Sequence, residues 1–184
     1  MTTETSPLIF DGHNDALLKL YRAGGTSAAD GFLTGRDGAI DVPSSKAGGF
    51  GGGFFAVYVP SPVDLEFKFE EMAKASYDLP LPDAIDWEDA FPVAMSQAAI
   101  LFDLERRGAL KVCTTAAQLR ATLGSGVMAA ILHIEGAEAI DAELNTLEVL
   151  YRAGLRSIGP VWSRPTIFGH GVPFRYPSGP DTGL

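Results

Sequence analysis

The feature that most constrains the fold is an alternation along the chain between short apolar runs and longer amphipathic segments. Apolar runs occur at 8–10, 54–59, 128–134 and 156–161, with a minor one at 110–113. Segments with helical periodicity lie between them, at 16–21, 69–77, 91–102, 115–124 and 141–154. Strands that alternate with helices in this way form parallel sheets with crossover helices. We therefore predict an α/β protein, either a doubly wound sheet or a (β/α)8 barrel, in a single domain over residues 1–184.

Composition and charge limit the partners of such a domain. The chain is 46% hydrophobic, which is enough for a globular core, and its formal net charge is -9. A surface this acidic has no electrostatic reason to bind nucleic acid or anionic membranes. No apolar run approaches the ~20 residues of a membrane helix, and the first residues lack the basic and apolar regions of a signal peptide. We expect a cytoplasmic protein without a membrane signal in this segment.

The polar string at 11–15 follows the first apolar run directly and contains the strongest local signal. In an extended segment His13 and Asp15 project to the same side, where an imidazole nitrogen and a carboxylate oxygen can bind one cation such as zinc. The carboxyl ends of parallel strands are also where ligands gather. The motif is short, however, and a loop histidine with an aspartate that caps the next helix is the simpler interpretation.

Glu135 follows the run at 128–134 and is expected at the same edge of the sheet as His13 and Asp15. A carboxylate at that place can bridge two metal ions, with one oxygen to each. The alternative is a solvated glutamate at the start of a loop. His133 lies two residues earlier inside the apolar run, and we interpret it as a hydrogen-bonded structural histidine rather than a ligand.

Other motifs carry weaker signals. The loop after the run at 156–161 contains Trp162, Arg164 and His170, which are candidates for binding a substrate carboxylate or an oxyanion. A loop that only covers the mouth of a barrel is an equal alternative. The glycine cluster at 48–53 precedes a strand instead of opening a helix, so it is not a phosphate site and instead allows close backbone approach. The single cysteine, Cys113, is expected to be a small buried residue.

Four segments together resemble the membrane (renal) dipeptidase family, zinc peptidases of the amidohydrolase superfamily. The segments are Ile9–Asp15, Gly51–Tyr58, Ile134–Ala137 and Leu150–Ser157, and they occur in the order of the family. The resemblance implies a (β/α)8 barrel of the metal-dependent hydrolase type, of which this chain looks like the first half. A barrel of this kind needs about 250 residues, so we expect Leu184 to be a truncation point.

The resemblance also implies a reaction and a set of ligands. It implies hydrolysis of dipeptides by a water or hydroxide held between two zinc ions in the full-length protein. His13 and Asp15 match the ligands of the first zinc, and Glu135 matches the carboxylate that bridges both. Family members place a histidine after the fourth strand, where this chain has Trp162, and His170 is the candidate to substitute for it. The family's later zinc ligands and proton-transfer aspartate belong to strands that follow the fourth.

Two alternatives remain open at this point. One is a different amidohydrolase, an N-acyl amino acid deacetylase or a lactamase, that uses the same metal pair. The other is a catalytically inert truncated fragment, stable only when it pairs with itself or with another chain. A half barrel would expose two unpaired strand edges, so we expect a homo-oligomer.

Overall fold

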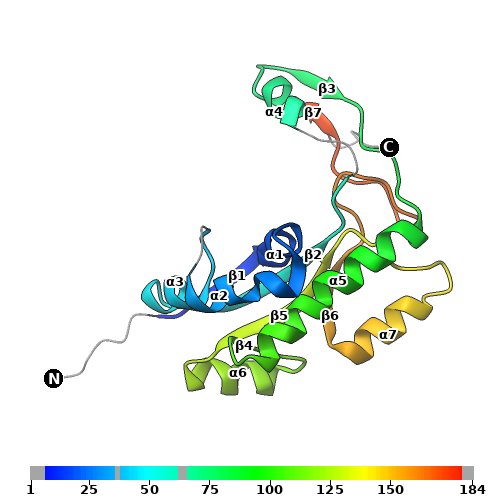
Figure 1. Cartoon of the computed structure of the whole chain (residues 1–184). Helices are drawn as coiled ribbons and strands as arrows, with labels where there is room; N and C mark the ends of the chain where they lie inside the picture. The colour runs from blue at the N-terminus through cyan, green and yellow to red at the C-terminus, as the bar shows by residue number, and fades with distance from the viewer. Residues whose placement is uncertain (1–6, 36–37, 62–65, 180–184) are drawn as a thin grey trace.

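The computed structural model describes residues 7–35, 38–61 and 66–179, and Figure 1 shows a sheet covered by helices. The strands of the main sheet are β1 (Ile9–Asn14), β2 (Phe50–Tyr58), β4 (Leu110–Val112), β5 (Met128–Glu135) and β6 (Leu155–Gly159). Every pairing in this sheet is parallel. The order is β1-β2-β5, and both β4 and β6 pair with β5. The prediction of an α/β protein with a parallel sheet is confirmed, and a strand lies at each of the five apolar runs.

Helices connect and cover these strands. They are α1 (Ala16–Arg22), a short 3-10 turn η1 (Gly25–Ala28), α2 (Ala29–Thr34), α3 (Val42–Ala47), α4 (Glu66–Met72), α5 (Trp87–Arg106), α6 (Ala116–Ser125) and α7 (Asn145–Ala153). The long helix α5 packs against α1, β2 and β4. Its Leu101 and Leu104 are fully buried in one core with Phe55 of β2 and Leu132 of β5. The helical face of the sheet is therefore the hydrophobic core.

The register of the strands aligns their carboxyl ends. Tyr58 at the end of β2 pairs with Glu135 at the end of β5, and Glu135 pairs with Gly159 at the end of β6. On the other side, Asn14 at the end of β1 pairs with Phe55. The residues that follow these strands therefore share one edge of the sheet, as expected from the parallel topology.

The structure differs from the sequence prediction between residues 66 and 79. The helix expected over 69–77 is α4, which already ends at Met72, and Tyr77 begins the short strand β3 (Tyr77–Leu79). β3 pairs antiparallel with β7 (Phe174–Tyr176), so two segments far apart in the sequence form a separate small sheet. Strands of three residues are too short to show a period of two, so the sequence pattern did not reveal them.

The helix predicted from Asp141 begins later, at Asn145. The Asp141 carboxylate nevertheless accepts hydrogen bonds from the backbone N–H groups of Asn145 (3.1 Å) and Thr146 (2.6 Å). These bonds satisfy amides of the first turn that have no partner within the helix. Hydrogen bonding from the Thr146 side chain and from these amides lowers the pKa of Asp141 to about 2. Asp141 therefore caps α7 although it lies four residues before the first residue of that helix.

The glycine cluster allows close backbone approach, as predicted. A Cβ atom at Gly52 (φ 152°) would overlap the carbonyl oxygen of Ala129 on β5. A Cβ atom at Gly53 would lie 2.8 Å from the Cβ of Asp11 on β1. At Gly52 and Gly53, β2 therefore lies so close to β5 and β1 that side chains do not fit there. Cys113 is buried, as expected, with its sulfur 3.5 Å from the Thr122 hydroxyl.

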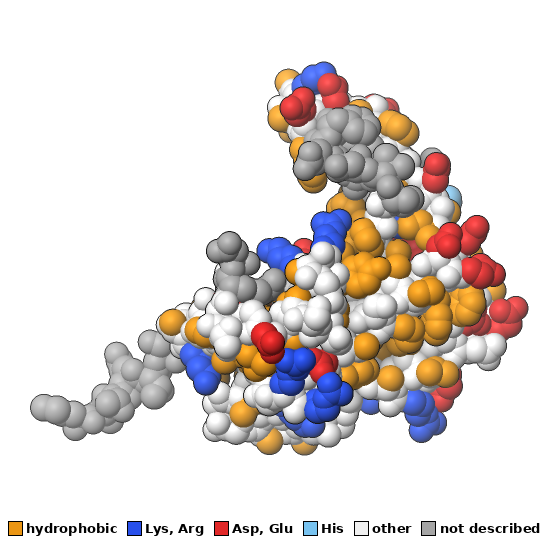
Figure 2. All heavy atoms as spheres, viewed as in Figure 1, with side chains coloured by type: hydrophobic (Ala, Val, Ile, Leu, Met, Phe, Trp, Pro, Cys, Tyr) orange, Lys and Arg blue, Asp and Glu red, His pale blue; other side chains and the backbone are white. Residues whose placement is uncertain are grey.

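The surface seen from the helical side carries clusters of charge. Figure 2 shows acidic side chains along the edge of the molecule beside the amino-terminal end of α5. Asp86, Glu88, Asp141 and Glu143 line a cavity of about 740 Å³ in this region, together with apolar residues that include Trp87. Among the described residues, none of the helices has the length and apolar character needed to cross a membrane.

Candidate metal centre

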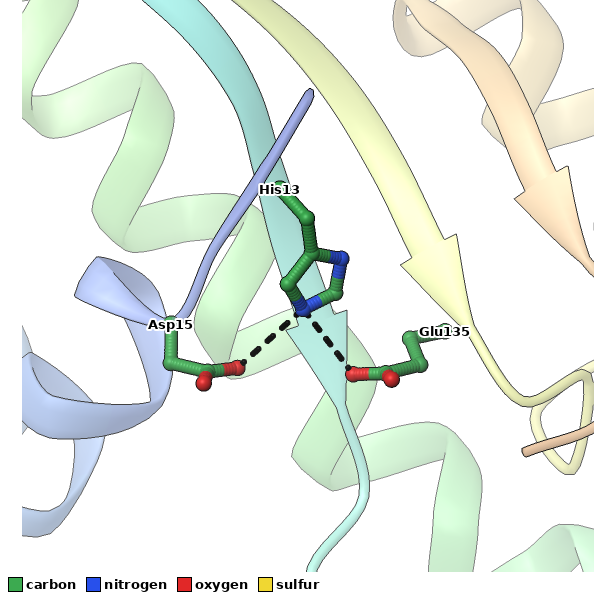
Figure 3. A group of neighbouring side chains, drawn as sticks. All are labelled: His13, Asp15 and Glu135. Carbon is green, nitrogen blue, oxygen red and sulfur yellow. Dashed lines mark ion pairs between the residues drawn. The ribbon is translucent and has the colours of Figure 1, made fainter. Parts of the chain in front are cut away.

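Three of the side chains singled out by sequence meet at the carboxyl edge of the sheet (Figure 3). His13 lies near the end of β1, Asp15 follows that strand, and Glu135 ends β5. The Nε2 atom of His13 lies 3.6 Å from Asp15 Oδ1 and 3.3 Å from Glu135 Oε2. One ligand atom from each residue lies within 4.8 Å of the other two. The structure thus brings together donors from two strands that are separated in the sheet by β2.

The spacing and chemistry of these donors fit a zinc ion. Zinc takes histidine nitrogen and carboxylate oxygen at about 2.0–2.1 Å, so neighbouring ligand atoms in a tetrahedral site lie about 3.3 Å apart. The separations from His13 Nε2, 3.3 and 3.6 Å, match that value without rearrangement of the backbone. His13 and Asp15 are exposed and Glu135 is half-buried, so the cluster can be reached from solvent. The residues present therefore fit a metal ion.

Asn14 lies between His13 and Asp15 at the end of β1. It is buried, and its side chain points away from the cluster. Its amide nitrogen donates to Asp11 Oδ2 (3.1 Å) and to the backbone oxygen of Phe54 on β2 (3.1 Å). Its amide oxygen accepts from the backbone N–H of Ala16 (3.3 Å). Because Asn14 stands between them, its bonds fix the directions of both His13 and Asp15. The sequence analysis did not predict a role for Asn14, although this residue lies in the polar string at 11–15 between the two predicted ligands.

Asp15 does not act as the helix cap that the simpler interpretation of the motif required. It occupies the position before α1, but its side chain makes no capping hydrogen bond to that helix. Its carboxylate points toward His13 instead (Figure 3). The observed geometry therefore favours the ligand interpretation of the His-x-Asp motif.

Burial and neighbouring charges set the electrostatics of the cluster. Burial raises the pKa of the Glu135 carboxyl, the positive form of His13 opposes that rise, and the charge of Asp15 adds to it. Two carboxylates that share a small volume repel each other unless a cation lies between them. A divalent cation at the centre of the cluster would remove that repulsion, which is a further reason why the arrangement suits a metal.

His133 lies beside the cluster but outside the set of ligand atoms found among the described residues. Its Nδ1 atom lies 2.9 Å from the Ser157 hydroxyl on β6, which confirms the prediction of a hydrogen-bonded histidine. Its ring packs edge-on against the His13 ring, with centroids 5.6 Å apart. Burial lowers the pKa of His133, and the nearby His13 lowers it further. His133 therefore supports the orientation of the His13 ring.

The loop after β6 places Trp162 near the same edge. Its ring packs edge-on against Tyr58 (5.7 Å between centroids) and against Phe174 (6.0 Å). Tyr58 pairs in register with Glu135, so this aromatic group lies beside the Glu135 strand end. Burial raises the pKa of the Tyr58 hydroxyl, and the nearby Arg164 opposes that rise. Trp162 and Tyr58 thus form an apolar wall next to the acidic cluster.

Arg164 is almost fully buried, in contrast to the exposed position expected of a residue that meets substrate. Its Nη2 atom donates to the backbone oxygen of Val59 (2.6 Å), and its Nε atom lies 3.2 Å from Glu138 Oε1. Burial raises the pKa of the Glu138 carboxyl, and Arg164 opposes this. The sequence analysis did not identify Glu138, because a glutamate three residues beyond a strand end has no distinctive pattern.

His170 is exposed in the same loop and follows Gly169, which bridges to Thr166. Among the described residues, the ligand atoms grouped within 4.8 Å come from His13, Asp15 and Glu135, without His170. The structure therefore unites three of the six predicted site residues, places Trp162 beside them, and leaves Arg164 and His170 outside the ligand group.

The chain is also similar in sequence to known proteins. A family model described as membrane dipeptidase (peptidase family M19) matches residues 3–180. An uncharacterized protein in the PQQ-III 3' region of Acinetobacter calcoaceticus is 32% identical over 177 residues, which cover 95% of this chain and 55% of that protein. An uncharacterized protein in the pqqA 5' region of Klebsiella pneumoniae is 40% identical over 97 residues, 52% of this chain and 36% of that protein.

Two solved structures share the fold closely. One is a metallo peptidase from Rhodobacter sphaeroides, liganded with a phosphinate mimic of the dipeptide L-Ala-D-Ala, with a TM-score of 0.89 and 48% identity. The other is the dipeptidase AC, a metallo peptidase of family M19, with a TM-score of 0.88 and 49% identity. Each match covers 97% of this chain, but only 52% and 51% of the solved chains. The chain thus spans about half the length of these structures.

Proposed function

Because the chain belongs to the membrane dipeptidase family, peptidase family M19, we propose that the protein is a metal-dependent dipeptidase that hydrolyses the amide bond of dipeptides. The observation that carries the proposal is the convergence of His13 Nε2 with carboxylate oxygens of Asp15 and Glu135 at the carboxyl edge of the sheet. The similar metallo peptidase with a bound dipeptide mimic supports the substrate class.

The metal that we propose is zinc, with two ions in the full-length protein. His13 and Asp15 would hold the first ion, and Glu135 would bridge the two. When bound, the metal supplies Lewis acidity, which polarises the scissile carbonyl and brings the pKa of water toward neutrality. The two carboxylates would offset the charge of the cations, and His13 Nε2, which lies 3.6 Å from Asp15 Oδ1 and 3.3 Å from Glu135 Oε2, would supply the nitrogen ligand.

The substrate would lie against the aromatic wall beside the cluster. Trp162 has 37% of its surface exposed and packs on Tyr58, so it can cover an apolar part of a dipeptide and keep water out. His170 remains a candidate for contact with the reacting carbonyl. Arg164 remains a candidate for substrate binding, but its buried contacts with Glu138 and Val59 support a structural role more directly.

We infer that the sheet is part of a (β/α)8 barrel. The support is the close similarity to solved chains about twice as long, and the about 250 residues that such a barrel needs. The intact mass of the protein from its native source tests this inference. A mass well above 19.5 kDa is expected, whereas a mass of 19.5 kDa would assign the remaining strands to another chain. The cytoplasmic location and the homo-oligomeric state stay predictions from the sequence.

The activity is tested with the full-length protein on a panel of L-Ala-D-Ala, L-Ala-L-Ala, N-acetyl-alanine and a simple lactam. Hydrolysis of the dipeptides is expected, with loss of turnover in a chelator and recovery when Zn²⁺ is added back. Metal-dependent turnover of N-acetyl-alanine or the lactam, without turnover of either dipeptide, would replace the proposal by a deacetylase or lactamase function. Absence of turnover across the panel after Zn²⁺ loading would overturn the proposed hydrolase function.

A further inference from the structure

We propose that the buried ion pair between Glu138 and Arg164 is a positioning device for the metal centre, which fixes the carboxyl ends of three strands relative to one another. This inference rests on the proposed function. The side chains of Arg164 and Glu138 are only 2% and 3% exposed, and Arg164 Nε lies 3.2 Å from Glu138 Oε1. Glu138 lies three residues after the metal-ligand candidate Glu135, and Arg164 lies two residues after Trp162.

Each partner contacts the chain next to the site. The Glu138 carboxylate lies so close to Gly136 that a Cβ atom there would overlap it, and Gly136 directly follows Glu135. Arg164 Nη2 donates to the backbone oxygen of Val59 (2.6 Å), one residue beyond Tyr58. Since Tyr58 pairs with Glu135, the ion pair connects the ends of β2 and β5 with the segment that follows β6.

The segment that follows Glu135 is joined to the end of β6 by its backbone. Gly136 and Ala137 donate to the backbone oxygens of Gly159 (2.9 Å) and Pro160 (3.1 Å), and Ala137 is buried although it also lines the cavity of about 740 Å³. The contact of Glu138 with Arg164 adds a side-chain constraint from the loop after β6. A small shift of this segment would move the Glu135 carboxylate away from His13 and Asp15.

The ion pair is a poor source of net stability, which favours a geometric role. Removing two charges from water costs several kcal/mol per ion, and mutual attraction offsets this only when the remaining polar atoms are also satisfied. Among the described residues, Glu138 Oε2 and both Nε and Nη1 of Arg164 have no hydrogen-bond partner, so Nε and Glu138 Oε1 meet as an ion pair without a hydrogen bond. An ion pair with unsatisfied polar atoms contributes less to the free energy of folding than its short separation suggests. It nevertheless fixes the position of the segment after β5 relative to the loop after β6.

The test compares the Zn²⁺ affinity of the full-length protein, measured by chelator competition, with its thermal unfolding midpoint. Glu138→Gln and Arg164→Met are each expected to weaken Zn²⁺ binding about tenfold, the size seen when groups that orient metal ligands are lost. Arg164→Lys keeps the cation and is expected to recover most of the affinity. If either Glu138→Gln or Arg164→Met fails to fold, the other variant serves as the test.

The matched control is Asp103→Asn, which removes another buried carboxylate. Asp103 forms an ion pair with Arg107 (2.7 Å) on α5, near β4 and the amino end of β5, away from the metal centre. This variant is expected to change the unfolding midpoint but not the Zn²⁺ affinity. If Glu138→Gln and Arg164→Met behave like Asp103→Asn, the positioning role is overturned. If the unmutated protein itself binds no Zn²⁺, the proposed function fails instead.

Discussion

The Nε2 atom of His13 lies 3.3 Å from the Glu135 carboxylate although β2 separates their strands in the sheet. Ala56 of β2 pairs in register with His133 of β5, whose ring packs against the His13 ring. The neighbours Phe55 and Val57 belong to the core cluster, so the alternation of a strand places Ala56 on the opposite face of the sheet. Ala56 is fully buried there, so a larger side chain at this position has no free space.

Replacement of Ala56 by leucine is expected to push His13 and Glu135 apart. Ala56 is fully buried, so the added atoms must displace neighbouring side chains on the face that carries the proposed ligands, and Zn²⁺ affinity should fall by about tenfold or more, as it does when ligand orientation is lost. Chelator competition on the purified variant measures this. Ala121→Leu adds the same atoms on the exposed surface of α6 and should leave the affinity unchanged. Equal affinities for the two variants would show that Ala56 does not limit the approach.

Glu135→Gln is expected to reduce both metal content and dipeptide hydrolysis. The amide keeps the shape of the side chain but removes the negative charge and one strong donor atom. Loss of a direct ligand should exceed the 10–100-fold effect of losing a group that only orients one, so kcat/KM should fall by more than about 100-fold. Glu143→Gln, an exposed glutamate in the loop before α7, is the control. Wild-type metal content in Glu135→Gln would remove this residue from the ligand set.

The cap on α7 predicts an acid-dependent loss of stability. The pKa of Asp141 is depressed from 3.8 to about 2 in the folded protein, so its contribution is complete above pH 3.8 and is lost as the pH falls through about 2. Asp141→Ala should therefore lower the thermal unfolding midpoint at pH 7, and the difference from wild type should shrink between pH 4 and pH 2. Asp141→Asn, which keeps a hydrogen-bond acceptor, should lose less. A difference independent of pH would rule out the ionised cap.

Gly52→Ala is expected to destabilise the fold by about 3 kcal/mol, because the new methyl group would collide with the Ala129 backbone on the neighbouring strand. The positive φ of 152° adds strain for any residue with a side chain. Denaturant unfolding of both proteins gives the difference. Gly124→Ala, in α6, has no neighbour within 4 Å of the added atom and should be neutral or stabilise by up to about 1 kcal/mol. Similar results at both positions would contradict the close approach of β2 and β5.

The sequence predicts the sheet and the proximity of His13, Asp15 and Glu135 well because both depend on local patterns. The run at 128–134 and the residue after it suffice to place Glu135 at a strand end, and parallel topology then brings it to the edge that holds His13 and Asp15. The small sheet of β3 and β7 and the contact of Glu138 with Arg164 depend on loops that meet only in the folded chain. Arg164 illustrates the limit, since an arginine in a loop after a strand has the same sequence pattern whether it faces substrate or is buried in an ion pair.

The hydrogen bonds of Asn14 have a consequence for how the metal centre is built. One amide side chain fixes the corner between β1 and α1, and both His13 and Asp15 are carried on that corner. The three side chains therefore lie on two parts of the chain, with His13 and Asp15 on the corner between β1 and α1 and Glu135 at the end of β5. The separation of these two parts across β2 sets the distance between His13 and Glu135.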